Sequence, residues 1–192
     1  MPDALKRFLD SIAAGDDART EKATLALGSL GDGALPAVRE LLDDSDADRR
    51  WWAARALAAV GTSKARELLV RTLDDHDASV RACATQGLGE LRAEEAVAGL
   101  VCSLADPSPL VSRIAADSLG RIGAPAVPAL IEALQAEATP TRAGAARALS
   151  VIQPQEAVPA LCAALDDPSA IVTHYAEEAL ERMGVGIVLF RP

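Results

Sequence analysis

The sequence predicts an all-α protein built as a solenoid of about six helix pairs. Three observations lead to this prediction. An offset of about 30 residues brings the same pattern back along nearly the whole chain. Hydrophobic residues make up 50% of the chain and aromatic residues only 3%, so most apolar positions hold alanine, leucine or valine, which suit closely packed helices. One leucine also recurs in every unit, forming a column of Leu27, Leu57, Leu88, Leu119, Leu149 and Leu180.

The first half of each unit is predicted to be a short helix. Its versions read GALPAVRELL from Gly33, KARELLVRTL from Lys64, EAVAGLVCSL from Glu95, PAVPALIEAL from Pro125 and EAVPALCAAL from Glu156. Pro36, Pro128 and Pro159 are expected in the first helical turn, because backbone N–H groups there have no intrahelical partner.

The second half of each unit is predicted to be a longer helix. Its versions read RRWWAARALAAVG from Arg49, VRACATQGLGELR from Val80, VSRIAADSLGRIG from Val111, TRAGAARALSVIQ from Thr141 and VTHYAEEALERMG from Val172. Val80, Ala84, Leu88 and Leu91 follow the spacing of a single apolar helix face.

Turn residues separate the predicted helices. Acidic clusters such as DDSDAD from Asp43 join the two halves, and we expect Ser108 and Thr139, each followed by proline, to cap second helices with their hydroxyls. Glycines that suit left-handed C-terminal positions follow the second helices at Gly31, Gly61, Gly123 and Gly184.

These elements predict a single repeat domain over residues 1–192. The helix pairs are expected at about 3–31, 32–61, 62–92, 93–123, 124–153 and 154–184. Each pair is too short to bury its own apolar face, so stacking on neighbours must supply the core. The apolar tail 185–192, VGIVLFRP, either caps the last pair or docks on a partner or another copy, which leaves the oligomeric state open.

Composition excludes several classes of function. The net charge of −9 disfavours nucleic acid and anionic membranes as partners. Cys83, Cys102 and Cys162 form neither a disulfide framework nor a metal-binding pair, and His76 and His174 lie about three units apart, too far to share a metal. With no signal peptide, cofactor motif or metal motif, we expect a cytoplasmic protein that is not an enzyme.

The unit D-D/P-x-x-x-V-R-x-x-A-A-x-x-L-G-x-I-G followed by A-V-P-A-L-x-x-A-L resembles the short HEAT-like repeats, including those first noted in phycobilisome lyases. The resemblance implies a right-handed α-solenoid of about six two-helix repeats. It also implies that neighbouring units are linked by a ladder of contacts. In this ladder the aspartates of the turns contact the arginines at the start of the second helices. Asp44 with Arg50 and Asp75 with Arg81 match this pattern, whereas Ser112 and Thr173 are expected to break it opposite Asp106 and Asp167.

The resemblance further implies that the second helices line the concave surface of the solenoid. The candidate partner-binding residues on this surface are Trp51, Trp52, Arg55, Gln86, Glu90, Arg113, Ile114, Asp117, Arg121, Arg147, His174, Tyr175 and Arg182. Tryptophan, tyrosine and arginine are common in binding hot spots. We expect Trp51 to be more exposed than Trp52, and the arginines either to contact a partner or to pair with Glu90, Asp117 and Glu178.

The sequence therefore favours a non-catalytic scaffold that binds a protein or peptide partner along the concave face. The convex face stays open as an alternative, since Arg39, Arg66 and Arg71 are expected there. The alternative, which rests on the resemblance alone, is a bilin lyase or another protein that handles a chromophore, with Trp51, Trp52, His174 and Tyr175 contacting a tetrapyrrole. Nucleic-acid binding is a third, weaker hypothesis, since the predicted groove carries charges of both signs.

Overall fold

The computed structural model describes residues 2–185, and within them the chain forms α-helices and short 3₁₀ segments but no β-strand. Residues 186–192 of the predicted capping tail lie outside the described residues. The chain divides into two compact units, Met1–Leu91 and Arg92–Pro192, which we call the N-terminal unit and the C-terminal unit. No described helix is long and apolar enough to cross a membrane.

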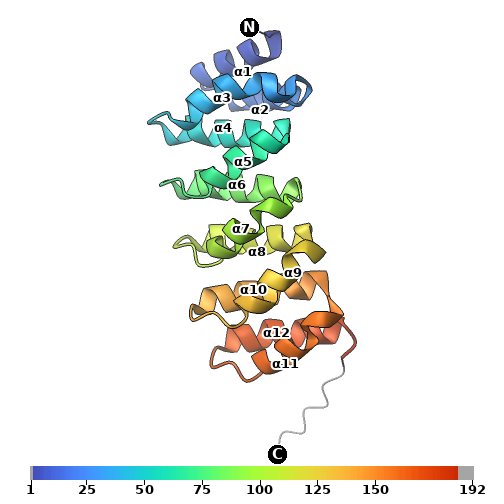
Figure 1. Cartoon of the computed structure of the whole chain (residues 1–192). Coiled ribbons are helices and arrows are strands. Elements are labelled where there is room, and N and C mark those ends of the chain that lie inside the picture. Colours follow the sequence, from blue (N-terminus) through green and yellow to red (C-terminus); the bar gives the residue numbers. More distant parts are fainter. Residues whose placement is uncertain (1, 186–192) are drawn as a thin grey trace, which may run out of the picture. The chain divides into compact units, whose positions relative to one another are not determined.

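The N-terminal unit contains three helix pairs. They are α1 (Asp3–Ala13) with α2 (Asp17–Leu27), α3 (Leu35–Leu42) with α4 (Ala47–Val60), and α5 (Ser63–Thr72) with α6 (Ala78–Glu90). A 3₁₀ segment, η1 (Gly28–Ala34), connects the first two pairs. Figure 1 shows the pairs in chain order from blue to green.

The C-terminal unit also contains three helix pairs, and a single 3₁₀ turn precedes the first helix of each. Its elements are η2 (Glu94–Ala96), α7 (Val97–Ser103), α8 (Pro109–Ile122), η3 (Ala124–Ala126), α9 (Val127–Ala133), α10 (Thr139–Ile152), η4 (Gln155–Ala157), α11 (Val158–Ala164) and α12 (Ala170–Arg182). Pro128 and Pro159 occupy the first turns of α9 and α11, as predicted.

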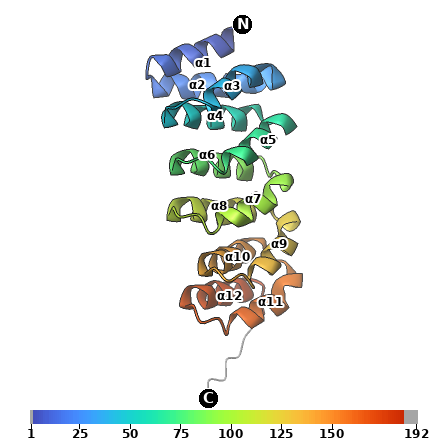
Figure 2. The same ribbon diagram turned by 60° about the vertical axis from the view of Figure 1, so that its left-hand side comes forward.

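Within each unit the second helices form the more closely packed layer. Helix α4 contacts α2 and α6, and α10 contacts α8 and α12, whereas α7 and α9 touch less than α8 and α10 do. Figure 2 shows these second helices side by side within each unit.

The predicted leucine column forms the core of both units. Leu27, Leu57 and Leu88 in the N-terminal unit have no exposed surface, and Leu119, Leu149 and Leu180 in the C-terminal unit have none either. Burying one leucine side chain contributes about 1.5–3 kcal/mol. Repetition of this buried position is therefore a main source of stability for helix pairs that have no core of their own.

The helix ends agree with the sequence at Gly61, Gly123 and Gly184. They do not agree at Gly31, which lies inside η1 beyond the end of α2 at Leu27, or at the hydroxyl caps. Gly61 and Gly123 end α4 and α8 with φ of 64° and 81°, a region that favours glycine. The hydroxyl of Ser108 makes no capping bond; its backbone N–H donates instead to Asp106 Oδ1 at 2.8 Å. Helix α10 begins at Thr139 itself, so Ala138 occupies the capping position and the predicted threonine cap is wrong.

The ladder runs from the arginine of one repeat to the aspartate of the next. Arg50 donates from Nε and Nη2 to the two carboxylate oxygens of Asp75 at 2.8 and 2.9 Å. Arg142 binds Asp167 in the same bidentate way, at 2.6 and 3.1 Å. All four side chains are largely buried, with exposed fractions of 8% to 13%. Bidentate arginine–carboxylate pairs fix orientation as well as distance, so each pair holds two successive turns in register.

Two expectations about the ladder are therefore corrected. The carboxylate of Asp44 pairs with Arg49 at 3.0 Å, and Arg50 meets only the backbone carbonyl of Asp44. Asp167 does not lose its partner at Thr173, because the partner is Arg142 of the preceding repeat.

Candidate partner-binding surface

The predicted site residues fall into two groups, one in each unit. We call Trp51, Trp52, Arg55, Gln86 and Glu90, on α4 and α6, the N-terminal face. We call the second group, on α8, α10 and α12, the C-terminal face. Its members are Arg113, Ile114, Asp117, Arg121, Arg147, His174, Tyr175 and Arg182.

Trp51 and Trp52 dominate the N-terminal face. Their rings meet edge to face, with centroids 4.8 Å apart and an interplanar angle of 89°. This is a favourable geometry for two aromatic quadrupoles. Both side chains are half-buried, so the expected contrast between an exposed Trp51 and a more buried Trp52 is not observed. Each ring shields part of the other, although the residues are adjacent in sequence.

The polar residues of the N-terminal face are partnered within the unit. Arg55 Nη2 donates to Glu21 Oε1 at 2.5 Å, which links α4 to α2. Gln86 Nε2 donates to Glu90 Oε1 at 2.8 Å along α6. Arg55 is therefore not a free cation, and Glu90 does not pair with an arginine of the face.

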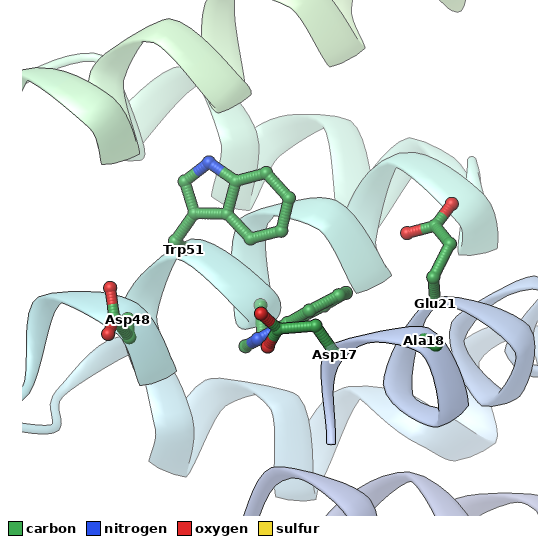
Figure 3. Close-up of a pocket in the computed structure, with 6 residues that line it drawn as sticks. Asp17, Ala18, Glu21, Asp48 and Trp51 are labelled. Atoms are coloured by element: carbon green, nitrogen blue, oxygen red, sulfur yellow. The ribbon is translucent and has the colours of Figure 1, made fainter. Parts of the chain in front are cut away.

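A pocket of about 450 Å³ opens beside the tryptophans. Its lining consists of Asp17, Ala18 and Glu21 from α2 and Asp48, Trp51 and Trp52 from α4. Figure 3 shows Asp17, Glu21 and Asp48 around this space, with Trp51 above it. The sequence analysis did not place Asp17, Ala18 or Asp48 at the site. The position of Asp48 could have been predicted, because it lies three residues before Trp51 and four before Trp52, and residues at these spacings share a helix face.

Arg147 is the centre of the C-terminal face. Its Nη2 donates to Asp117 Oδ1 at 2.8 Å, and its Nη1 donates to the hydroxyl of Tyr175 at 3.4 Å. The guanidinium carbon lies 5.9 Å from the centroid of the Tyr175 ring, within the range of a cation–π contact. Partial burial lowers the pKa of Arg147, but the bonds to Asp117 and Tyr175 outweigh it and raise the pKa overall.

The remaining cations of the C-terminal face differ in their pairing. Arg182 pairs with Glu178 at 2.6 Å, one helical turn away. Arg113 and Arg121 are exposed and form no ion pair with any residue in the described range 2–185. The sequence analysis left open whether the arginines pair within the chain, and Arg147 and Arg182 do so, with Asp117 and Glu178.

A larger pocket, of about 680 Å³, lies on the C-terminal unit beside α8, α10 and α12. Arg113, Arg147 and Tyr175 line it, whereas Ile114, Asp117, Arg121, His174 and Arg182 do not. The rest of its lining consists mostly of small residues and prolines: Ala105, Asp106, Pro107, Pro109, Ser112, Ala116, Thr139, Pro140, Ala143, Gly144 and Ile171.

Two local substitutions in the repeat pattern explain why the pocket forms there. The equivalents of Gly144 in the other repeats are Lys22, Trp52, Cys83, Ile114 and Tyr175. A Cβ at Gly144 would lie 2.7 Å from Cδ2 of Leu104, so this position is closed to a larger residue and leaves a hollow above it. The ladder also lacks its link between this repeat and the preceding one, where Ser112 stands at the arginine position and Ala136 at the aspartate position.

The described residues carry no evident reaction chemistry. Burial raises the pKa of the Cys83 thiol to about 12, which keeps it protonated near neutral pH. Within residues 2–185 no group of three or more histidine, cysteine, aspartate or glutamate side chains is placed to hold a metal ion.

Comparison with solved structures places the chain among helical repeat proteins. An archaeal HEAT-like repeats protein from Thermococcus onnurineus NA1 has a TM-score of 0.57 at 15% identity, covering 85% of this chain and 76% of that chain. The complex of CpcE and CpcF of phycocyanin lyase from Nostoc sp. PCC7120 has a TM-score of 0.55 at 27% identity, covering 78% and 64%. A designed armadillo repeat protein in complex with the peptide (KR)4 has a TM-score of 0.50 at 19% identity, covering 95% and 100%.

Comparison of sequences gives the family. No curated protein matches the chain. The family profile described as HEAT repeats matches residues 35–108 and 97–181, which together span more than half of the chain. The all-α solenoid class and the resemblance drawn from the repeat pattern are therefore confirmed, and the chain belongs to the HEAT repeat family.

Proposed function

We propose that the chain is a non-catalytic scaffold that binds a segment of a partner protein on the concave side formed by its second helices. The observation that carries this proposal is the pocket of about 680 Å³ on the C-terminal unit. Its floor is small and apolar, and Tyr175, Arg113 and Arg147 surround it. This combination of an apolar depression with a few directional polar groups is typical of sites that accept a side chain of a partner.

The chemistry of the C-terminal face indicates what such a segment carries. An apolar side chain suits the pocket, where Ile171 keeps 51% of its surface exposed. Arg113 and Arg121 are the cations of this face that have no carboxylate partner among residues 2–185. We therefore propose that carboxylates of the partner meet Arg113 and Arg121, while Arg147 holds Tyr175 in place.

The solved structures support a protein partner. The designed armadillo repeat protein holds a peptide, and CpcE and CpcF form a complex with one another. Repeat scaffolds of this kind carry function in their surfaces rather than in their fold. A role in binding rather than in catalysis agrees with these neighbours.

Affinity capture from a lysate of the source organism tests the proposal. The bait is the wild-type chain beside a Trp51→Ala/Trp52→Ala/Tyr175→Ala variant whose helicity by circular dichroism equals that of wild type. An Arg39→Ala/Arg71→Ala variant is the matched control, because both arginines are exposed on first helices. We expect a partner retained by wild type and control but lost from the triple variant. Equal retention by all three baits would contradict the proposal.

The alternative of a bilin lyase-like role has one observation in its favour, the 27% identity to the CpcE and CpcF structure. In this alternative the aromatic residues of one face or the other would contact a tetrapyrrole. Mixing the protein with a free bilin and recording the visible spectrum tests it directly. A spectrum equal to the sum of the separate components would contradict it.

A further inference from the structure

The pocket beside the two tryptophans combines aromatic rings with carboxylates, a composition different from that of the pocket in the C-terminal unit. Its volume is about 450 Å³, and α2 and α4 supply its walls. Asp17 and Asp48 each lie in the first turn of their helix. Figure 3 shows Asp17 and Asp48 below the ring of Trp51 in this view.

The tryptophan pair offers a surface that attracts cations. The faces of aromatic rings carry negative potential, and indole attracts an ammonium group more strongly than phenyl or phenol does. Because the two rings stand at 89° to one another, they form two sides of a corner. Both rings are half-buried and line the pocket, so a group placed there contacts indole surface directly.

The carboxylates of the pocket differ in how far their charge is compensated. Glu21 is paired with Arg55 at 2.5 Å. Asp17 and Asp48 are exposed and form no ion pair with any residue of the described chain. Two negative charges without an ion-pair partner therefore flank the indole corner, in a protein whose net charge is −9.

We infer that this pocket binds the side-chain ammonium of a lysine from the partner segment, an inference that rests on the proposed scaffold function. The indole faces would contact the ammonium and its methylene stem, and Asp17 and Asp48 would accept its hydrogen bonds. A purely apolar side chain fits less well, because three carboxylates line the pocket. A metal ion fits less well too, since these carboxylates are not grouped as ligands.

The chain provides its own reporter for this inference. Trp51 and Trp52 are its only two tryptophans, so intrinsic tryptophan fluorescence reports on this pocket alone. The probe is N-acetyl-lysine methylamide, titrated at constant ionic strength, and the neutral comparison is the same compound acetylated on Nε. We expect a saturable change in emission with a dissociation constant of about a millimolar for the charged probe and no saturable change for the neutral one.

Variants of matched charge locate the binding. Asp17→Asn/Asp48→Asn removes the two carboxylates without an ion-pair partner, and we expect it to weaken binding of the charged probe about fivefold or more. Glu132→Gln/Asp166→Asn removes the same charge from exposed positions of the C-terminal unit and should leave the titration unchanged. Circular dichroism establishes that both variants keep the wild-type helicity.

Three outcomes would overturn the inference: no saturable response to the lysine probe, an equal response to the neutral probe, or equal weakening in both double variants. None of these depends on a natural partner being found. The capture experiment can therefore fail while the pocket binds lysine, and the pocket can fail while Tyr175 and Arg113 still hold a partner. The two proposals are distinguished in this way.

Discussion

The N-terminal and C-terminal faces use equivalent helix positions for different chemistry. In the N-terminal unit the position three residues after the start of the second-helix motif holds Trp52, and carboxylates surround the tryptophan pair. In the C-terminal unit the same position holds Ile114, Gly144 and Tyr175, and the pocket that Gly144 and Tyr175 line is also lined by arginines and prolines. In both units a fully buried leucine occupies the equivalent core position of the same helix. The core of a repeat therefore sets where a surface residue stands, but not what it recognises.

The largest expected effect breaks the feature that both faces share. Leu57→Ala and Leu149→Ala each remove a fully buried side chain from the column beneath a face. Each should lower the free energy of unfolding by about 2–5 kcal/mol, because the transfer and cavity terms add. Urea denaturation followed by circular dichroism measures the loss. A loss below about 1 kcal/mol at either position would mean that the leucine column does not stabilise the unit that contains that leucine.

A smaller loss of stability is expected from a substitution at Gly144, a position that distinguishes the C-terminal face from the N-terminal face. Gly144→Ala introduces a Cβ that would lie 2.7 Å from Cδ2 of Leu104, and overpacking of this kind costs about 1–3 kcal/mol. Because alanine gains about 1 kcal/mol over glycine inside a helix, we expect a net loss of up to about 2 kcal/mol. Gly33→Ala in the N-terminal unit is the control, because nothing lies within 4 Å of its Cβ position. The control should be neutral or stabilising by up to about 1 kcal/mol. Equal stability of the two variants would show that the hollow does not depend on this glycine.

The ladder predicts how stability changes with pH in both units. Burial raises the pKa of Asp75, but hydrogen bonds from Arg50 and Asp77 lower it below 3.8 overall. The pKa of Asp167 lies below 3.8 chiefly because Arg142 donates to it. A carboxyl with a depressed pKa in the folded state stabilises the fold above its unfolded pKa and loses this contribution as pH falls through the folded value.

Asp75→Asn and Asp167→Asn should therefore flatten the acid dependence of unfolding between about pH 5 and pH 2. Both variants should also be less stable than wild type at pH 7, where the aspartates are ionised. Thermal unfolding across this pH range measures the slope, with the exposed Asp166→Asn as the control. Slopes unchanged from wild type in both aspartate variants would contradict the role of the ladder.

The smallest expected effects come from the partly exposed ion pairs at the two faces. Glu21→Gln breaks the pair with Arg55, and Asp117→Asn breaks the pair with Arg147. Each should cost less than about 1 kcal/mol, since water solvates both partners. Only Glu21→Gln should also shift tryptophan emission, because Glu21 and the tryptophans line one pocket. An emission shift of equal size in Asp117→Asn would contradict the separation of the two faces.

The fold could be predicted from the sequence because the same apolar spacing and the same turn residues recur in each repeat. The leucine column and the glycines at Gly61 and Gly123 recur at fixed positions, and each has one clear physical reason. The ladder was harder to read, because its bonds join positions 25 residues apart in different repeats. Counting within one unit therefore assigned Asp167 to Thr173 rather than to Arg142.

The candidate site was only partly readable. The sequence proposed Arg55 and Arg147 as contacts for a partner, yet both pair with carboxylates of neighbouring helices, at Glu21 and Asp117. Periodicity shows which side of a helix a residue occupies, but not which side chain of the next helix reaches it. The pocket at Gly144 was equally hidden, because it depends on where Leu104 packs.

The most direct test of the account is calorimetric titration of the captured partner segment into four forms of the protein. These are wild type, Tyr175→Ala/Arg113→Ala on the C-terminal face, Asp17→Asn/Asp48→Asn at the tryptophan pocket, and the first-helix control Arg39→Ala/Arg71→Ala. We expect about tenfold or greater weakening for the C-terminal variant, a smaller loss for the pocket variant and no change for the control. Equal affinity of all four forms would contradict the claim that the second helices bind the partner.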